Sequence, residues 1–427
     1  MISSDARKSL SLRLNDRFFY GWVMLGVGGI GLFASGPAQS HTFSVFITPI
    51  CADLGMSATA VASAYAGATL VASLGLPFMG RLADRFGFRI MTLWIGLLFG
   101  FALIAFGQIA NAAMLAIGFA ALRFLGQGSL MLNSNGLVSQ WFSRKRGFAL
   151  AVATFGFSIS MAVHPAVAQW LIDHVGWRES WMWMGLATWV LVLPGALFLM
   201  QNKPEDLGLQ PDGGTADGAD AGNGPRDAVD VGLSLQEAMR TGAFWIVALT
   251  LGSFSLLVTA MFFHQVSILG HQGISPQTAS QIFTISAVTM VVTMPIVGRL
   301  LDRLPTQPVF ATSMLVVAGA LIAMANVDGL ASAVIFSLVF GAANGASQAH
   351  ITFVWPRFFG RKHLASILGV AQMITVVGAS IGPLPFGIAF DLFGDYTGAL
   401  YGTAALPVVC AIAVLFLRPP KIPGRDL

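Results

Sequence analysis

Twelve long apolar runs follow one another along this chain, and they constrain its fold more than any other feature. Each run is long enough to cross a lipid bilayer as an α-helix, which takes about 20 apolar residues. None shows the alternating pattern of a membrane β-strand. We therefore predict an all-α membrane protein with twelve transmembrane helices, at residues 19–47, 58–80, 89–110, 112–140, 147–172, 180–200, 242–269, 277–298, 307–326, 329–356, 363–390 and 397–417.

The composition agrees with a chain embedded in a membrane. Hydrophobic residues make up 56% of its 427 residues and charged residues only 10%, whereas a soluble domain carries about 25% charged residues. Its 48 glycines suit helices that pack closely in a bundle. The two cysteines, Cys51 and Cys410, lack the spacing of a metal site or a redox motif, so we expect no metal ion and no cofactor.

The basic residues predict the orientation, because connections on the cytoplasmic side of a membrane carry an excess of lysine and arginine. Both termini then lie in the cytoplasm, as in a multi-pass protein of the cytoplasmic (inner) membrane. We attribute the sequence pI of about 9.3 to these residues rather than to a nucleic-acid partner. The connections placed in the cytoplasm contain Arg81, Arg85, Arg89, Arg144, Lys145, Arg146, Arg299, Arg303, Arg357, Arg361 and Lys362.

The chain repeats its own pattern after about half its length. The stretch "GRLADR" at 80–85 returns as "GRLLDR" at 298–303, an offset of 218 positions. In the first helix of each half the offset is 223, so that His41 matches His264. The repeat predicts two related bundles of six helices each.

A polar segment at 202–240 separates the two halves. It is rich in glycine, aspartate, alanine and proline, a composition that cannot bury a core, so we predict a flexible cytoplasmic linker. Near its end, Ser234 and Glu237 have the spacing of a capping box, which predicts the start of a short helix. The predicted domains are the bundles 1–201 and 241–427, joined by this linker.

These features resemble the major facilitator superfamily over essentially the whole chain. The loop motif of that family, G-x-L-x-D-R-x-G-x-R, stands complete as "GRLADRFGFR" and is reduced to "GRLLDR" in the second half. The stretches "YGW", "HTFSVF", "WFSRKRGFALAVA" and "GWRESW" are similar to the monocarboxylate and oxalate/formate transporter branch and its bacterial relatives. The resemblance implies a secondary transporter that works by alternating access.

The resemblance also implies that the loop motif is a latch, which packs against the second half when the cytoplasmic gate is shut. We expect Gly80 to allow a tight approach of helix and loop, and Asp84 to accept backbone amides where the next helix begins. Alternatively, the arginines only set the topology and Asp84 only caps a helix. The predicted latch consists of Gly80, Asp84, Arg85 and Arg89, the arginines lying in water, with Gly298, Asp302 and Arg303 as a weaker counterpart.

One arginine, Arg123, stands 11 residues into the fourth apolar run, about 16 Å deep at the rise of an α-helix. A charge at that depth costs at least about 2.5–3.5 kcal/mol, so the side chain must face the bundle interior. It could bind a carboxylate or similar anion through two N–H groups, or it could be satisfied by helix carbonyls and neighbouring amides. The family resemblance implies proton relay or conformational coupling as another role. None of the 19 acidic residues falls at mid-depth, which favours the bound anion.

Histidines extend this candidate site. His41 and His264 lie on the first helices of the two halves, where each could bind an anion or carry a proton. In the monocarboxylate branch, a lysine commonly holds the place of His41. The alternative is that both histidines hydrogen-bond to neighbouring helices. Gln265, directly after His264, belongs to the candidate site.

Two further polar positions match each other in the halves. Asn133 and His350 are 217 residues apart, and each could face the substrate cavity or join neighbouring helices. His164 precedes Pro165, and we expect it to bond a backbone carbonyl that the proline leaves free. The complete candidate substrate site is Arg123, His41, His264, Gln265, Asn133 and His350.

One departure limits what the family resemblance can supply. Animal monocarboxylate carriers use an aspartate and an arginine in the eighth helix, and the oxalate exchanger uses an arginine there and a lysine in the eleventh. Residues 281–298 and 365–382 of this chain contain neither. Proton–lactate coupling therefore cannot be transferred residue by residue.

We predict a secondary active transporter that moves a small organic anion, in the first instance a monocarboxylate, together with protons. Its partners are that anion, protons and the lipid bilayer, and we expect a monomer. A proton-driven exporter of drugs or other amphipathic compounds is an alternative, but it predicts a titratable carboxylate within the membrane. A carrier of a neutral solute or vitamin, with a structural Arg123, is another. The sequence shows no nucleophile constellation and no phosphate-binding loop, so we do not expect an enzyme.

Overall fold

The computed structural model describes residues 4–213, 232–360 and 362–420. Within them the chain is helical, and the β pairing is limited to a single bridge between Gly232 and Gly360. Eleven helical stretches are long and apolar enough to cross a membrane. The prediction of an all-α membrane protein is confirmed. Arg361 and the middle of the predicted linker, 214–231, lie outside the described residues.

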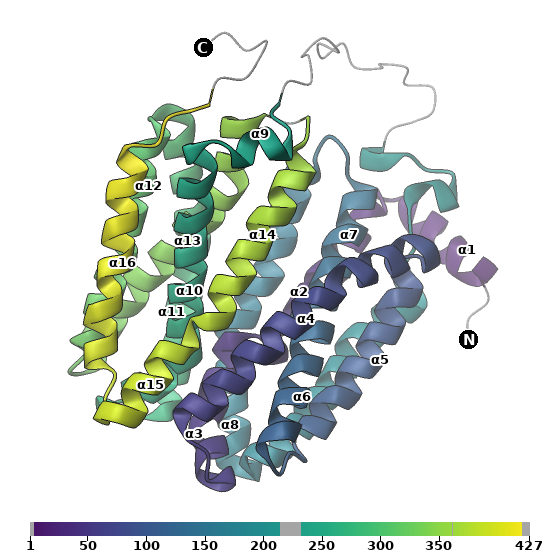
Figure 1. Cartoon of the computed structure of the whole chain (residues 1–427). Helices are drawn as coiled ribbons and strands as arrows, with labels where there is room; N and C mark the ends of the chain where they lie inside the picture. Colours follow the sequence, from purple (N-terminus) through teal and green to yellow (C-terminus); the bar gives the residue numbers. More distant parts are fainter. Residues whose placement is uncertain (1–3, 214–231, 361, 421–427) are drawn as a thin grey trace. The chain divides into compact units, whose positions relative to one another are not determined.

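The bounds of the helices follow the predicted apolar runs. Figure 1 shows these helices with their labels. In chain order, those before the linker are α1 (Ser4–Asn15), α2 (Gly21–Ala34), α3 (Ser40–Leu54), α4 (Ala58–Phe86), α5 (Phe88–Phe106), α6 (Ala112–Leu122), α7 (Met131–Trp141) and α8 (Arg146–Pro194). Those after it are α9 (Leu235–Met239), α10 (Gly242–His271), α11 (Pro276–Arg303), α12 (Thr306–Ala325), α13 (Leu330–Phe359), α14 (Leu364–Ile381), α15 (Pro383–Phe393) and α16 (Thr397–Leu415).

Helix α8 contains two of the predicted runs, which explains why eleven stretches accommodate twelve runs. Gly176 interrupts it with a φ of 81° and a ψ of 161°. A residue with a side chain is strained at such a positive φ, whereas glycine adopts it readily. The glycine therefore provides the turn between the fifth and sixth runs.

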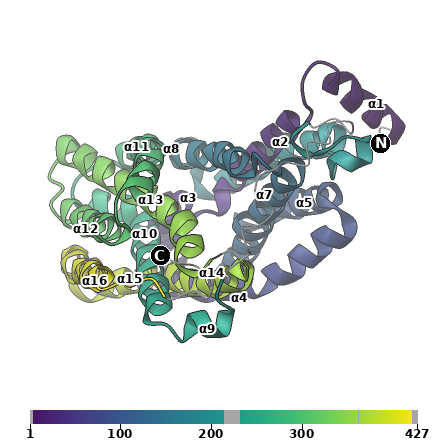
Figure 2. The same cartoon turned by 90° about the horizontal axis from the view of Figure 1, so that it is seen from above.

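The chain forms two compact units. Unit 1 comprises Met1–Ile50 and Gly67–Asn223, and unit 2 comprises Cys51–Ala66 and Gly224–Leu427. In unit 2, helices α10, α11, α12, α13 and α16 lie together, as Figure 2 shows from above. The domain limits proposed from the sequence stay a prediction. In each unit we call the end nearest the linker segments 200–213 and 232–242 the linker end, and the opposite end the far end.

Matching glycines bring the first helix of each half against a later one. In unit 1, a Cβ on Gly156 of α8 would overlap the carbonyl oxygen of Gly29 on α2. In unit 2, a Cβ on Gly378 of α14 would overlap the carbonyl oxygen of Gly252 on α10. Gly29 and Gly252 are separated by the same 223 positions as the predicted repeat. Small residues allow helix backbones to touch in a membrane protein, and here they do so twice.

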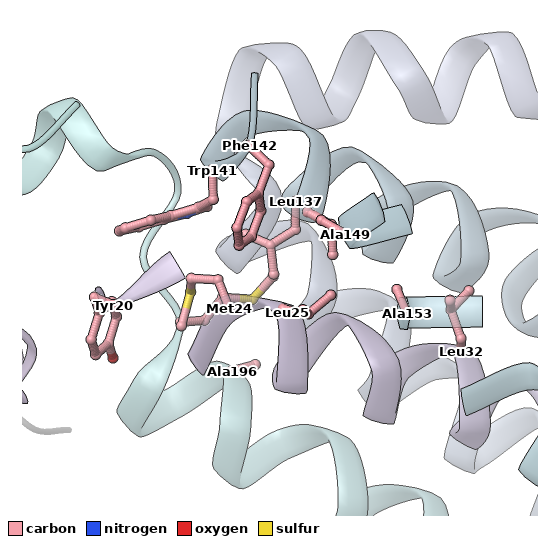
Figure 3. Close-up of a cluster of buried hydrophobic side chains, with 12 residues drawn as sticks. Tyr20, Met24, Leu25, Leu32, Leu137, Trp141, Phe142, Ala149, Ala153 and Ala196 are labelled. Atoms are coloured by element: carbon pink, nitrogen blue, oxygen red, sulfur yellow. The ribbon is translucent and has the colours of Figure 1, made fainter. Parts of the chain in front are cut away.

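A buried aromatic cluster closes the linker end of unit 1 (Figure 3). Tyr20 and Trp141 are fully buried, and their ring centroids are 5.7 Å apart. The Tyr20 hydroxyl donates to the carbonyl of Leu199 at 2.6 Å, and the Trp141 indole N–H donates to the carbonyl of Gln201 at 3.3 Å. Both aromatic side chains thereby satisfy their polar atoms. The chain that leaves α8 is fixed to the start of α2.

The first part of the predicted linker is ordered on unit 1, so the prediction of a wholly flexible linker is wrong. The Asp212 carboxylate accepts hydrogen bonds from the backbone amides of Ser143, Arg144 and Lys145, at 3.0, 2.7 and 3.2 Å. Partial burial acts to raise the pKa of Asp212, but these amides outweigh it and the pKa lies below its usual value. Asp212 thus caps the loop that leads into α8, a long-range contact that composition could not reveal.

At the other end of the linker, the predicted capping box is confirmed. The Ser234 hydroxyl accepts from the amide of Glu237 at 3.3 Å, and the Glu237 carboxylate accepts from the amide of Ser234 at 2.8 Å. The short helix α9 follows. The amide of Leu233 also donates to the carbonyl of Phe359 at 3.0 Å, which joins this segment to the end of α13.

Substitution of Gly156 by alanine is expected to lower the apparent melting temperature of the purified protein in detergent. Its new methyl group meets backbone, which cannot rotate away, so the packing of α2 on α8 must loosen at a cost of about 1–3 kcal/mol. Gly29→Ala is the matched control, because a Cβ there lies 3.9 Å from its nearest neighbour, the carbonyl oxygen of Ala153. Melting is monitored by tryptophan fluorescence. Equal melting temperatures of the two variants would contradict this packing argument.

Candidate functional site

The candidate substrate residues divide between the units. Arg123, His41 and Asn133 belong to unit 1, and His264, Gln265 and His350 belong to unit 2. All six are at most 3% exposed. The surroundings of each must therefore satisfy or tolerate a buried polar group.

Arg123 opens a π-helical segment, Arg123–Leu130, that joins α6 to α7. A π turn is wider than an α turn and is found frequently at functional sites. The Arg123 side chain is 3% exposed, and its Nη1 donates to the carbonyl of Ala38 at 3.3 Å. The guanidinium therefore faces the interior of unit 1, as its depth in the fourth run predicted.

The partner of Arg123 lies at a break in the first span. Helix α2 ends at Ala34, a 3₁₀ turn follows at Gly36–Ala38, and α3 begins at Ser40. Within this break, the Thr42 hydroxyl donates to the carbonyl of Gly36 at 2.7 Å. The break turns the Ala38 carbonyl out of the regular helix ladder, where it can accept from a side chain.

Two histidines join Arg123 in unit 1, and we call Arg123, His41 and His164 the basic cluster. His41, at the start of α3, is 1% exposed and lies within electrostatic range of both His164 and Arg123. His164 of α8 is 9% exposed. Three elements of unit 1 thereby bring one permanent cation and two titratable bases together.

Close packing holds His164 in place. A Cβ on Gly36 would overlap the His164 ring and the hydroxyl of Ser160, so only glycine fits the break at that point. The Nδ1 atom of His164 lies 3.1 Å from the Ser160 hydroxyl and 3.2 Å from its carbonyl, and the ring packs on Phe33 at 4.6 Å. The α2–α3 break and α8 therefore form one wall of the cluster.

Sequence reasoning missed His164 as a member of the site. The proline at 165 frees the carbonyl of Met161, whereas His164 contacts Ser160, so the predicted role of His164 is wrong. The available signal was the spacing of Ser160 and His164, which lie four residues apart and share one face of α8. That spacing shows a neighbouring pair, but it does not show what the pair faces.

Asn133 lies away from the basic cluster. It is ten residues after Arg123, about 15 Å along the helix axis. Its amide donates to the carbonyl of Phe88 at 2.8 Å and to the hydroxyl of Thr92. The contact joins α7 to the first turn of α5, and a substrate contact by Asn133 stays a prediction.

In unit 2, His264 connects α10 to the start of α15. Its Nε2 lies 2.9 Å from the carbonyl oxygen of Pro383, to which it donates. Tyr396 and Phe386 surround the ring, with centroids at 5.5 and 6.1 Å. This geometry corresponds to the alternative in which the histidine bonds a neighbouring helix.

Gln265 and His350 are buried at different levels of unit 2. Among the described residues, neither side-chain atom of Gln265 has a hydrogen-bond partner. His350 donates through Nδ1 to the carbonyl of Ala346 at 2.7 Å and stacks on Phe310 at 4.3 Å. Gln265 lies near the far end of α10 and His350 near the linker end of α13, so the two do not share one site.

The loop motif differs from its prediction in two details. Helix α4 continues to Phe86, so Asp84 lies in its last turn and does not cap α5. Gly87, at a φ of 84°, forms the connection, and the side chain of Asn202 accepts from the amide of Arg89 at 2.9 Å. Asn202 takes the capping position that was assigned to Asp84.

Arg89 also differs from its prediction, because it does not simply lie in water. Its Nε donates to the carbonyl of Ala196 at 3.0 Å, at the π-helical end of α8. A Cβ on Gly80 or Gly298 would meet nothing within 4 Å, so neither glycine makes the tight approach that was expected. Four latch residues remain exposed at helix ends: Asp84, Arg85, Asp302 and Arg303.

Comparisons with known proteins agree with this architecture. Bovine (Bos taurus) monocarboxylate transporter 13 is 26% identical over 384 residues, covering 89% of this chain and 85% of the relative. The multidrug resistance protein MdtG of Escherichia fergusonii is 23% identical over 396 residues, covering 91% of each. The crystal structure of a bacterial homologue of the human lysosomal transporter Spinster, inward-facing and unoccupied, superposes with a TM-score of 0.67 at 15% identity, covering 97% of this chain and 95% of that one.

The family assignment rests on the length of the match. The family description of the Major Facilitator Superfamily matches residues 28–272 and 258–426, which together take in both halves of the chain. The repeated loop motif and the repeated glycine contacts fall inside these ranges. The chain therefore belongs to the Major Facilitator Superfamily.

Proposed function

We propose that this transporter moves a small organic anion, in the first instance a monocarboxylate, by proton-coupled alternating access. The basic cluster carries the proposal. Arg123, His41 and His164 meet inside unit 1, where an apolar surrounding strengthens electrostatic attraction to a negative ligand. The likeness to monocarboxylate transporter 13 over most of both chains supports the same substrate class.

The guanidinium suits a carboxylate in both charge and shape. It is planar and always protonated, and two of its N–H groups can bond the two oxygens of one carboxylate. In unit 1, the acidic residues within the long helices, Asp84, Asp173 and Glu179, lie within about a turn of a helix end or of the Gly176 turn. The charge in the middle of the unit is therefore positive, which favours entry of an anion.

The two histidines supply groups that can carry the coupled proton. An imidazole changes its charge within the physiological pH range, unlike a guanidinium. A proton that enters with the anion would reside on His41 or His164, and the charge of the anion would offset that of the imidazolium. The proton and the anion thereby stabilise each other's binding.

We further propose that the linker ends face the cytoplasm and that the protein acts as a monomer in the cytoplasmic membrane. The positive-inside rule supports this orientation, because basic residues concentrate in the linker-end connections. The exposed latch residues then lie on the cytoplasmic side. His264, Gln265, His350 and Asn133 are not needed for the anion site in this proposal.

One alternative has support of its own. The likeness to MdtG over 91% of both chains favours a proton-driven exporter of amphipathic compounds. An apolar hollow of about 320 Å³ between α4 and α5, bordered by Phe124 and Leu125, is of a size to accept such a compound. A carrier of a neutral solute or vitamin would leave Arg123 with a structural role only.

Replacement of Arg123 by glutamine is expected to reduce carboxylate uptake about ten- to a hundredfold. This range corresponds to the loss of charge-assisted hydrogen bonds worth about 1.5–3 kcal/mol. The measurement is uptake into proteoliposomes of a panel of short monocarboxylates, each beside its neutral amide analogue. Arg178→Gln is the control, since Arg178 bonds the carbonyls of Gly107 and Ile109 at the far end of unit 1.

Two outcomes of this assay would decide against the proposal. If Arg123→Gln moves carboxylates as fast as the parent protein, the anion site is not at Arg123. If the parent moves amides or cationic amphipaths in preference to carboxylates, one of the alternative functions holds. Preserved melting of both variants shows that the comparison concerns transport rather than folding.

Replacement of His41 or His164 by glutamine is expected to uncouple transport from the proton gradient. Exchange of anion for anion at equal pH continues, because Arg123 remains, but an imposed pH gradient no longer drives accumulation. His174→Gln on the same helix α8 is the control, since His174 is exposed. Accumulation at the parent's level in both variants would show that neither histidine carries the coupled proton.

A further inference from the structure

Helix α4 begins in unit 2 and continues into unit 1. Residues 51–66 group with unit 2, and the helix passes Ala66 and Gly67 without interruption. Its first turns therefore contact elements that come from the second half of the sequence. These contacts lie within unit 2, at its far end.

Asp391 makes the most direct of these contacts. Its two carboxylate oxygens accept from the backbone amides of Ala58 and Thr59, at 3.1 and 2.8 Å. The hydroxyls of Thr59 and Ser57 also bond to it. The carboxylate thus sits on the first turn of α4, where amides lack partners in the helix and the helix dipole is positive.

This arrangement is more than an ordinary helix cap. Ser57 already provides a local cap, because its hydroxyl accepts from the amide of Ala60 at 3.1 Å. Asp391 lies more than 330 positions further along the chain. Because Asp391 belongs to α15, its bonds to the first turn of α4 join these two helices.

The backbone of α15 is shaped for this contact. A Cβ on Gly387 would lie 3.0 Å from the carbonyl oxygen of Ala58, tighter than ordinary packing. Gly387 is one helical turn before Asp391, on the same face of α15. About two turns further into α4, the ring of Tyr65 lies on that of Phe263, with centroids 4.5 Å apart.

Helix α15 itself is held firmly on α10. It continues α14 after a bend at Gly382 and Pro383 (Figure 1). A Cβ on Gly382 would overlap the carbonyl of Leu256, and His264 bonds the carbonyl of Pro383. These contacts hold α15, and with it Asp391, in a fixed position on α10. His264 acts as a positioning residue for α15.

We propose that Asp391 is a releasable clamp that keeps the far end closed by holding the start of α4. The Asp391 carboxylate is exposed and its bond to the Thr59 amide lies at the surface, so water can replace the carboxylate there, whereas its bond to the Ala58 amide is partly buried. Gly387 has no side chain that could interlock with α4, so it does not hinder the separation of α4 from α15. When the clamp opens, the start of α4 separates from α15. This separation is the far-end opening that the alternating access of our proposed function requires.

The test measures a distance within unit 2 by electron paramagnetic resonance. Spin labels are attached at Ala52→Cys and Phe393→Cys, both exposed sites, in a background with Cys51→Ser and Cys410→Ser. The parent is expected to show mainly a short distance, with a minor population at a longer one. Asp391→Ala is expected to raise the population with a longer distance about fivefold, the effect of one lost helix cap.

Two further variants make the test selective. Gly387→Ala should raise the long-distance population as well, because its methyl group pushes the Ala58 carbonyl away. Asp395→Ala is the control, since the Asp395 carboxylate accepts from the amide of Thr397 at 2.9 Å, at the start of α16. The clamp is overturned if Asp391→Ala and Gly387→Ala both keep the parent's distances, or if Asp395→Ala changes them equally.

The measurement needs no substrate. A negative result would therefore count against the clamp and leave the anion site untouched. A failure of anion transport in the proteoliposome assay, with the distance change intact, would count against the anion site alone.

Discussion

The cost of holding a guanidinium at mid-depth in a membrane protein determines much of the architecture of unit 1. Arg123 can stay there only if polar groups reach it, and the first span supplies one by breaking its helix around Gly36–Ala38. The break in turn requires a glycine at 36, because the ring of His164 occupies the space of a side chain. The buried charge thus lies where three irregular features meet, namely the break in the first span, the π-helical segment of the fourth and the close contact of Gly36 with α8.

The number and type of helices could be predicted because each apolar run carries its own signal. A bilayer requires about 20 apolar residues per crossing, and this requirement acts on each segment independently of its neighbours. The capping box at Ser234 and Glu237 is equally local and equally visible. The contact of Gly29 with Gly156 was not predicted, because glycine is abundant and its sequence position does not show which backbone it touches.

The candidate site was less accessible to sequence reasoning. The depth of Arg123 and the repeat that pairs His41 with His264 could be read directly, yet the two histidines have different surroundings in their units. The capping of α5 by Asn202 depends on where a distant segment folds back. The same holds for His164, whose place in the basic cluster depends on the break in the first span rather than on the neighbouring proline.

The contact between Asp212 and the loop at 143–145 determines where the linker is attached to unit 1. The covalent exit from α8 is near Leu199, but the chain is bonded again at Asp212 before it leaves the described part at Gly213. The effective anchor point is therefore the beginning of α8 rather than its end. Tension along the linker would act on α8, which also carries Gly156 and His164. It would therefore act on the wall of the basic cluster.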